Sequence, residues 1–217
     1  MNKIIKDQLS KLKPSATLAI NEQSEELKKI GKKIFKFGFG QSPFPVPESV
    51  VSALKNNASK HTYLPMQGLK ELRLAISNYL KKNNKNNFNP DDILIGPGTK
   101  ELMLLTQIAF NGEILLPAPS WVSYQPQAII GRNKVHWIET SSNNNWFPTA
   151  DHLEKKIKET KNKNLIFFIN SPNNPSGTVC KNLEEIANIA KKYKLIILSD
   201  EIYSQLTFND KYESISN

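Results

Sequence analysis

The residue types best suited to chemistry lie in three short segments that each follow an apolar run. These are Gly96-Pro97-Gly98-Thr99-Lys100 after residues 93–95, Ser171 to Gly177 after 165–169, and Asp200-Glu201-Ile202-Tyr203 after 195–198. The first can hold a phosphate, because N–H groups at a helix start are free and glycine removes steric cover. Asp200 follows a buried strand, where a carboxylate needs a cation or N–H groups as partners. Taken singly, each segment also fits an ordinary turn, and Asp200 also fits a helix N-cap.

Alternating strands and helices must position these segments. The hydrophobic pattern predicts strands at 93–95, 114–116, 135–138, 165–169 and 195–198, and helices at 68–80, 102–108 and 182–193. The last two strands are continuous apolar runs, which is typical of strands covered on both faces. The sequence therefore predicts a three-layer α/β fold with a mostly parallel sheet. In such sheets ligands gather at the carboxyl ends of the strands, where the three segments would lie.

Finer details are also predicted. Leu102, Leu105 and Ile108 would line one face of a helix, and Asn182-x-x-Glu185 resembles a capping box. The first 35 residues predict polar helices at 4–12 and 25–34, broken at Pro14. The Gly- and Pro-rich residues 37–47 then mark a boundary.

Composition narrows the class of protein. With 39% hydrophobic and 23% charged residues the chain has a globular balance. The net charge of +9 raises the question of nucleic acid, but only Arg73 and Arg132 are arginines, so solvated lysine faces are favoured. The single Cys180 and three dispersed histidines exclude an intrachain disulfide framework and indicate no metal site. No run approaches the roughly 18 apolar residues of a membrane span, and no signal peptide is evident, so we expect a soluble cytoplasmic protein.

The order of these motifs carries a family resemblance. GPGTK, PSW, SPNNPSG and SDEIY resemble, in sequence and spacing, the class I and II aminotransferases, which are pyridoxal-phosphate (PLP) enzymes of fold type I. FGFGQSPFPVP and the pattern Y-x-x-x-x-G-L-x-E-L-R from Tyr63 to Arg73 resemble N-terminal landmarks of that family. The match runs from about Pro14 to the last residue. It implies PLP as cofactor, an amino acid and a 2-oxo acid as substrates, and a homodimer.

The resemblance also implies roles for individual residues. Asp200 matches the carboxylate that keeps the pyridine nitrogen protonated, which makes the ring an electron sink. Asn174 and Tyr203 match the residues that hydrogen-bond the phenolic oxygen of the ring. The remaining matches are Gly98, Thr99 and Lys100 in the phosphate cup, Trp121 stacked on the ring, Tyr63 at the phosphate of the neighbouring subunit's cofactor, and Gly40 at the substrate carboxylate. Ser171 departs from the family's usual Asn, which concerns loop shape more than the cofactor.

One family residue has no match in the sequence. The Schiff-base lysine of the family lies a few tens of residues after D-E-x-Y, whereas this sequence ends at Asn217, and Lys211 comes too early. The sequence therefore resembles an N-terminal fragment that supplies one face of the cofactor site, contains no catalytic residue of its own and is inactive alone. Residues 1–45 would form an N-terminal arm and part of a small domain. Residues 46–217 would form the N-terminal part of the large PLP-binding domain.

Other functions stay open at this point. A PLP-dependent lyase or synthase, such as a carbon–sulfur lyase, uses the same electron sink. The chain could also be a non-catalytic PLP-binding fragment or a generic phosphate-binding α/β protein. An effector-binding module of a transcription regulator would carry a helix-turn-helix before the domain, and the family match begins almost at Met1. Transamination is the leading hypothesis.

Overall fold

Two compact units make up the chain. The structure, a computed structural model, describes residues 4, 6–12, 16–35, 37, 40, 42–84, 87–208 and 211–217. One unit contains residues 1–10 and 66–217, and the other contains 11–65. The predicted helix break at Pro14 and parts of the 37–47 loop lie outside the described residues. The boundary predicted between residues 45 and 46 falls inside the 11–65 unit, and the division into small and large domains stays a prediction.

The described part of the 11–65 unit contains two α-helices. They are α1 (Ala16–Lys29) and α2 (Glu48–Asn57). The helices predicted at 4–12 and 25–34 are wrong in extent, because the described part of the first holds only the 3-10 turn η1 (Leu9–Lys11) and the second begins earlier. Residues 16–29 contain neither Pro nor Gly, so the helix runs on until Gly31, which has a φ of +79°.

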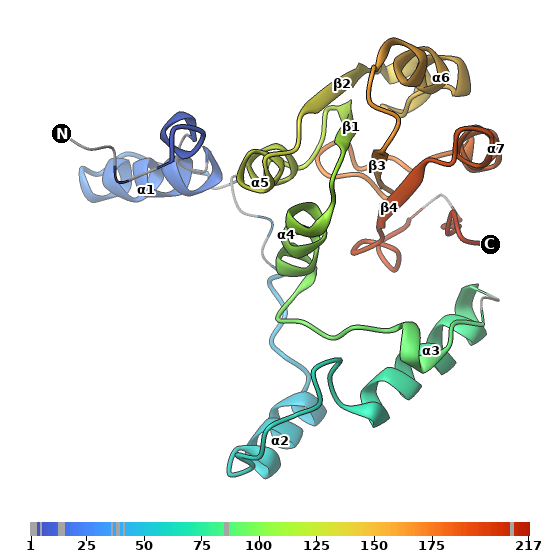
Figure 1. The fold of residues 1–217 in the computed structure, drawn as a ribbon. Helices are drawn as coiled ribbons and strands as arrows, with labels where there is room; N and C mark the ends of the chain where they lie inside the picture. Colours follow the sequence, from blue (N-terminus) through green and yellow to red (C-terminus); the bar gives the residue numbers. More distant parts are fainter. Residues whose placement is uncertain are drawn as a thin grey trace. The chain divides into compact units, whose positions relative to one another are not determined.

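A parallel sheet forms the centre of the larger unit (Figure 1). Its described strands lie in the order β2-β1-β3-β4 and all pairs are parallel. The strands are β1 (Glu113–Ala118), β2 (Val135–Glu139), β3 (Leu165–Asn170) and β4 (Ile196–Asp200). The predicted α/β fold with a parallel sheet is therefore confirmed. The strand predicted at 93–95 does not form, because these residues lie outside the sheet and Ile95 N–H instead donates to the Gln67 carbonyl at 2.9 Å.

Helices cover both faces of this sheet, giving three layers. On β3, Leu165, Phe167 and Ile169 pack with α6 (Ala150–Glu159) and α7 (Leu183–Tyr193). Between them, Ile166 and Phe168 pack with α4 (Thr99–Ala109) and α5 (Tyr124–Gly131) (Figure 1). Because successive side chains of a strand point to opposite faces, both faces of β3 need apolar residues. The unbroken run LIFFI is the consequence.

A further helix is tied to the same unit by an arginine. The helix predicted at 68–80 is α3 (Lys70–Asn84), and the 3-10 turn η2 (Pro90–Asp92) packs against it. The buried Arg73 donates from Nη1 to the Pro90 carbonyl at 2.7 Å and to Asp91 Oδ1 at 3.0 Å. A third 3-10 turn, η3 (Ser142–Asn144), follows β2.

The capping box predicted at Asn182 is wrong, and the apolar face predicted in α4 is not the face that the structure buries. In α4 the buried residues are Met103 and Gln107, whereas Leu105 and Ile108 are about half exposed, because the adjacent α5 covers a different face. Asn182 is the N-cap residue of α7, but its side chain makes no capping bond among the described residues. Its amide instead donates to the Pro148 carbonyl at 3.0 Å and accepts from the Cys180 thiol at 3.3 Å.

An ionic cluster joins α6 to α7. Glu154 accepts from Lys192 Nζ at 2.6 Å and from the Tyr193 hydroxyl at 2.7 Å, and Lys158 Nζ lies 3.3 Å away. The hydrogen bond from Lys192, followed by that from Tyr193, lowers the pKa of Glu154 from 4.5 to about 2. The carboxylate form is therefore favoured by folding.

We expect this cluster to stabilise the α6–α7 pair in a pH-dependent way. A carboxyl whose pKa is lower in the folded state contributes fully above pH 4.5, and the contribution is lost as the pH falls towards 2. Urea unfolding of the wild type and of Glu154→Gln between pH 6 and pH 2.5 measures it. The stability difference between the two should shrink across this window, and a constant difference would contradict the assignment.

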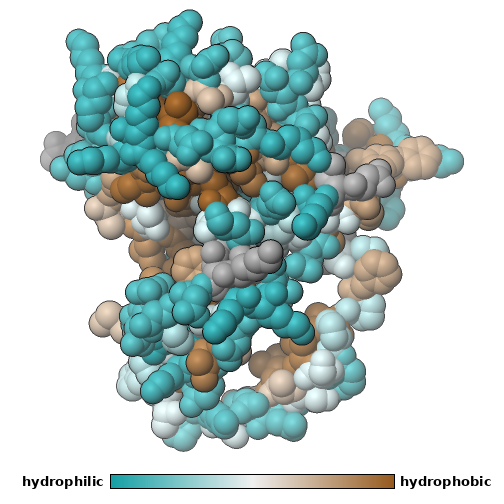
Figure 2. All heavy atoms as spheres, turned by 90° about the vertical axis from the view of Figure 1, so that its right-hand side faces the viewer, coloured by the Kyte–Doolittle hydropathy of each residue, from teal (hydrophilic) through white to brown (hydrophobic). Residues whose placement is uncertain are grey.

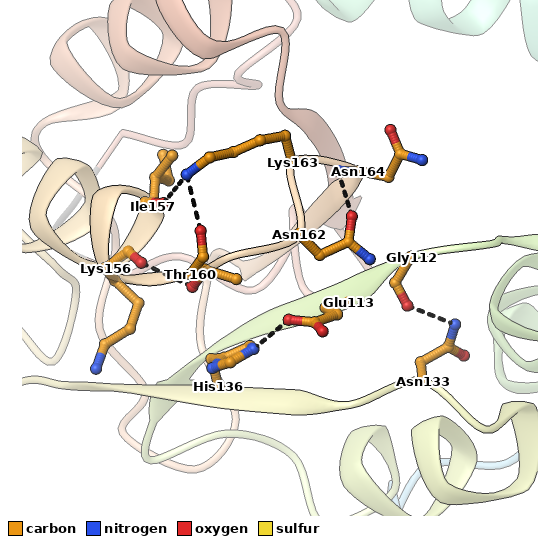
Figure 3. A network of polar contacts seen from close by, with 10 residues as sticks. All are labelled: Gly112, Glu113, Asn133, His136, Lys156, Ile157, Thr160, Asn162, Lys163 and Asn164. Atoms are coloured by element: carbon orange, nitrogen blue, oxygen red, sulfur yellow. Dashed lines mark hydrogen bonds and ion pairs between the residues drawn. The ribbon is translucent and has the colours of Figure 1, made fainter.

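Polar contacts line the amino-terminal edge of the sheet (Figure 3). His136 Nε2 lies 2.5 Å from Glu113 Oε2, and Lys163 Nζ donates to the carbonyls of Ile157 and Thr160 at 3.1 and 2.7 Å.

The described residues hold no group of three or more His, Cys, Asp or Glu side chains that could bind a metal. None of the described helices is long and apolar enough to cross a bilayer.

The outer surface of α6 and α7 is polar. Lys155 and Lys158 on α6 and Lys191 and Lys192 on α7 are exposed. Figure 2 shows hydrophilic side chains over the part of the surface that these two helices occupy. At these positions the positive charge of the chain therefore faces solvent.

Candidate functional site

The carboxyl edge of the sheet gathers the segments that the sequence singled out. β1 ends at Ala118 just before Pro119-Ser120-Trp121, β3 ends at Asn170 before the 171–177 loop, and β4 ends at Asp200. Asn170 and Asp200 are register partners on neighbouring strands. GPGTK follows no strand, but it leads into α4, which packs on the same sheet.

The Asp200 carboxylate is buried and held by hydrogen bonds. Asp200 is only 8% exposed. Oδ2 accepts from the Tyr124 hydroxyl at 2.7 Å, and Oδ1 accepts from Ile202 N–H at 3.3 Å. Asp200 does not cap a helix, because turns follow it at 202–205. The partners that a buried carboxylate needs are therefore a hydroxyl and a backbone N–H.

Tyr124 is one of two residues of the candidate site that the sequence analysis missed. It begins α5, is buried, and packs edge-on against Trp121 with ring centroids 5.5 Å apart. Burial, and then the charge of Asp200, raises the pKa of Tyr124 far above its ordinary value, so the hydroxyl stays protonated and donates. Its only sequence signal is a tyrosine three positions after Trp121.

Asn170 links the ends of β3 and β4 to the following loop. Its Nδ2 donates to the Asp200 carbonyl at 2.8 Å, and its Oδ1 accepts from Asn174 N–H at 2.7 Å. Asn174 Nδ2 in turn donates to the Tyr203 hydroxyl at 3.4 Å. Asn170 was also missed, although it is the one polar residue that ends the apolar run LIFFIN.

The 171–177 loop is shaped by prolines and by Ser171. Both X–Pro bonds in it, at Ser171–Pro172 and Asn174–Pro175, are cis. The buried Ser171 accepts from Cys180 N–H through Oγ at 3.0 Å, so its side chain is used within the loop. Gly177 has a φ of +71° and donates to the Asn173 carbonyl at 2.8 Å, which closes the turn.

The start of α4 is open. Gly98 is the N-cap residue of α4 with a φ of +100°, and as a glycine it makes no side-chain capping hydrogen bond. A Cβ built on Gly98 would meet none of the described atoms within 4 Å. The N–H groups of the first turn therefore point to accessible space, as an anion site at a helix start requires. Lys100 Nζ lies 5.3 Å from the Trp121 ring centroid, in cation–π range.

Direct contacts thus join most of the residues predicted for the site. One chain of contacts runs from Lys100 through Trp121 and Tyr124 to Asp200. A second runs from Asp200 through Asn170 and Asn174 to Tyr203. Gly98 and Thr99 adjoin Lys100 at the start of α4. Gly40 and Tyr63 belong to the 11–65 unit, and their roles stay predictions.

The fold and the motifs together define a class of protein. The chain belongs to the class I and II aminotransferases, because the model of that family, "Aminotransferase class I and II", matches residues 32–217. The resemblance inferred from the motifs is therefore confirmed.

Particular relatives are aspartate aminotransferases. The chain is 34% identical over 216 residues to an aspartate aminotransferase of Bacillus sp. (strain YM-2), covering 96% of this chain and 54% of the relative. It is 34% identical over 217 residues to a probable aspartate/prephenate aminotransferase of Rickettsia typhi, covering 95% and 53%. A solved single mutant of the Thermus thermophilus aspartate aminotransferase superposes with a TM-score of 0.88 at 28% identity, covering 98% of this chain and 56% of that one. The chain spans about half the length of the curated relatives it matches.

Proposed function

We propose that this chain supplies one face of a PLP site in an enzyme that exchanges an amino group between an amino acid and a 2-oxo acid. The observation that carries the proposal is the buried Asp200 carboxylate, which Tyr124 and Ile202 N–H hold at the end of β4. A carboxylate there suits a cationic ring nitrogen, and family membership supports the same role.

The residues present fit PLP. The open helix start at Gly98 suits a phosphate. Trp121 contacts Lys100, which adjoins this helix start, and Tyr124, which binds Asp200, so its ring offers an aromatic face between the phosphate position and the carboxylate. When bound, PLP supplies the electron sink for the chemistry at the substrate's α-carbon. Asp200 would hold the proton on the ring nitrogen. Asn174 and Tyr203 would hydrogen-bond the phenolic oxygen. The N–H groups of Thr99 and Lys100 would hold the phosphate beside Gly98, whose own N–H donates to the Gly96 carbonyl at 2.8 Å.

Two further roles belong to the proposal. Gly40 would contact the substrate carboxylate, and Tyr63 would reach the phosphate site of a second subunit in a homodimer. The Tyr63 side chain is fully exposed, which leaves it available for a partner subunit. Aspartate is the first amino acid to test, because the relatives described above are named for it.

The 217-residue chain alone is expected to give no measurable turnover. We assign none of its lysines as the Schiff-base lysine, and without that group the covalent cofactor link and the proton shuttle are missing. Oxaloacetate formation from aspartate and 2-oxoglutarate, in the presence of PLP, measures this. The complete aminotransferase of a relative is the positive control, and turnover by the chain above the PLP-only background would contradict the expectation.

Binding of pyridoxamine 5'-phosphate tests the proposed site directly, because this form of the cofactor needs no covalent lysine link. Quenching of tryptophan fluorescence on titration should be saturable, and inorganic phosphate should compete. Trp121→Phe should reduce the quenching, since Trp121 is the tryptophan in the contact chain that runs from Lys100 to Asp200. Absence of saturable binding by the wild-type chain would overturn the proposal.

A further inference from the structure

Two buried glutamines connect α4 and α5. Gln107 is 0% exposed and Gln127 is also buried. Gln107 Nε2 donates to Gln127 Oε1 at 3.0 Å and to the Met103 carbonyl at 3.2 Å. Gln127 Nε2 donates to the Lys100 carbonyl at 2.8 Å. The two amides therefore form a short ladder that ends on the first turn of α4.

Stability does not explain this ladder. Gln107 Oε1 has no hydrogen-bond partner among the described protein atoms, although it is buried. A buried acceptor without a partner costs folding free energy, and apolar residues of similar shape can replace such pairs at little cost. The surrounding cluster is apolar and includes Met103, Ala128 and Ile114. A polar ladder retained at this place points to a use other than packing.

The ladder acts where the phosphate is proposed to bind. The Lys100 carbonyl belongs to the same helical turn as the N–H groups that follow Gly98. Three residues before Gln127, Tyr124 on the same helix donates to Asp200 at 2.7 Å. Residues three apart lie on one helix face, so α5 contacts both ends of the proposed site.

We propose that Gln127, braced by Gln107, is a positioning residue for the cofactor phosphate. It fixes the first turn of α4 on α5, and thereby sets the distance from the phosphate-binding N–H groups to the Asp200 carboxylate. Such a site must hold its groups within about 0.5 Å of their productive positions. The inference rests on the proposed function, and it adds to the proposed site two residues, Gln107 and Gln127, that do not contact the ligand.

The test compares two ligands that differ only in the phosphate. Dissociation constants of pyridoxamine 5'-phosphate and of pyridoxamine are measured for each variant of the 217-residue chain, and the ratio of the pyridoxamine constant to the pyridoxamine 5'-phosphate constant reports the phosphate contribution. Gln127→Met should lower this ratio about tenfold, because one positioning hydrogen bond is lost. Gln107→Met should lower it about threefold, because Gln127 then loses the amide that braces it but keeps its own hydrogen bond to the Lys100 carbonyl. This second variant carries the test should Gln127→Met fail to fold.

Asn133 provides the matched control. Its buried amide also donates to carbonyls that follow the far end of α4, at Phe110 (2.9 Å) and Gly112 (3.2 Å). Figure 3 shows the contact with Gly112. Its Oδ1 likewise has no partner among the described protein atoms. Asn133→Leu should therefore change the ratio of dissociation constants by less than about twofold.

The outcomes separate this inference from the proposed function. Saturable binding of pyridoxamine 5'-phosphate with an unchanged ratio in both glutamine variants overturns the role of Gln127 alone. An equal fall in Asn133→Leu also overturns it, because the effect would then be general loosening of α4. No saturable binding by the unmodified chain overturns the proposed function and this inference together.

Discussion

Replacing Asp200 by Asn is expected to weaken the binding of pyridoxamine 5'-phosphate about 100-fold. The substitution keeps the shape and an oxygen that can accept from the Tyr124 hydroxyl, but it removes the negative charge that would face the ring nitrogen. Losing one partner of a desolvated charge pair costs about 2–5 kcal/mol, and about 3 kcal/mol corresponds to the stated factor. The fluorescence titration described above measures the change.

Glu201→Gln is the control for this variant. Glu201 is the next residue, but its Oε1 accepts from the hydroxyls of Ser199 at 2.9 Å and Ser214 at 2.7 Å, so it anchors the 211–217 segment. The substitution Glu201→Gln removes a negative charge one position from Asp200 and should change the affinity for pyridoxamine 5'-phosphate by less than about twofold. Equal effects of the two substitutions would mean that net charge, and not the Asp200 position, governs binding.

Replacing Phe167 by Ala is expected to destabilise the fold by about 3–5 kcal/mol. Phe167 is 0% exposed at the centre of β3 and belongs to the larger core cluster, with Leu115, Leu153 and Ile186. Truncation leaves a cavity that the two helices α6 and α7 cannot close without moving off the sheet. Since a domain has a total stability of about 5–15 kcal/mol, a large part would be lost. Urea unfolding followed by circular dichroism gives the value.

Phe208→Ala is the matched control, because Phe208 is 95% exposed. Its removal should change the free energy of unfolding by less than about 0.5 kcal/mol. A similar loss for both phenylalanines would show that the β3 core is not the part of the chain that limits its stability.

The strand pattern and the motif order were predictable from local sequence. LIFFIN is continuously apolar because both faces of β3 are covered. The prediction that the 195–198 run is covered in the same way is wrong, because β4 lies at the edge of the described sheet and Ile196 is 52% exposed. Motifs such as SPNNPSG and SDEIY lie at strand ends, so their convergence follows once the strands are parallel. The strand predicted at 93–95 is wrong, because a short apolar run does not show whether a neighbouring strand is present to pair with it.

Which face of a helix is buried, and which residues of other elements it contacts, were not predictable in the same way. An apolar stripe such as Leu102, Leu105 and Ile108 shows that a helix has a hydrophobic side, but not which neighbouring helix covers which side. The structure buries Met103 and Gln107 in α4 instead. Tyr124 and Gln127 gain their roles only because α5 packs over α4 and the sheet, across sequence separations of 76 and 27 residues from Asp200 and Lys100.

The sequence by itself determined the fold class, the family and the residues of the loops at the carboxyl ends of the strands, because periodicity and turn chemistry are local properties. Only the tertiary structure decided what holds the Asp200 carboxylate and the first turn of α4 in place. Those contacts join residues on different elements, and the packing of whole layers sets their distances. No spacing along the chain encodes them.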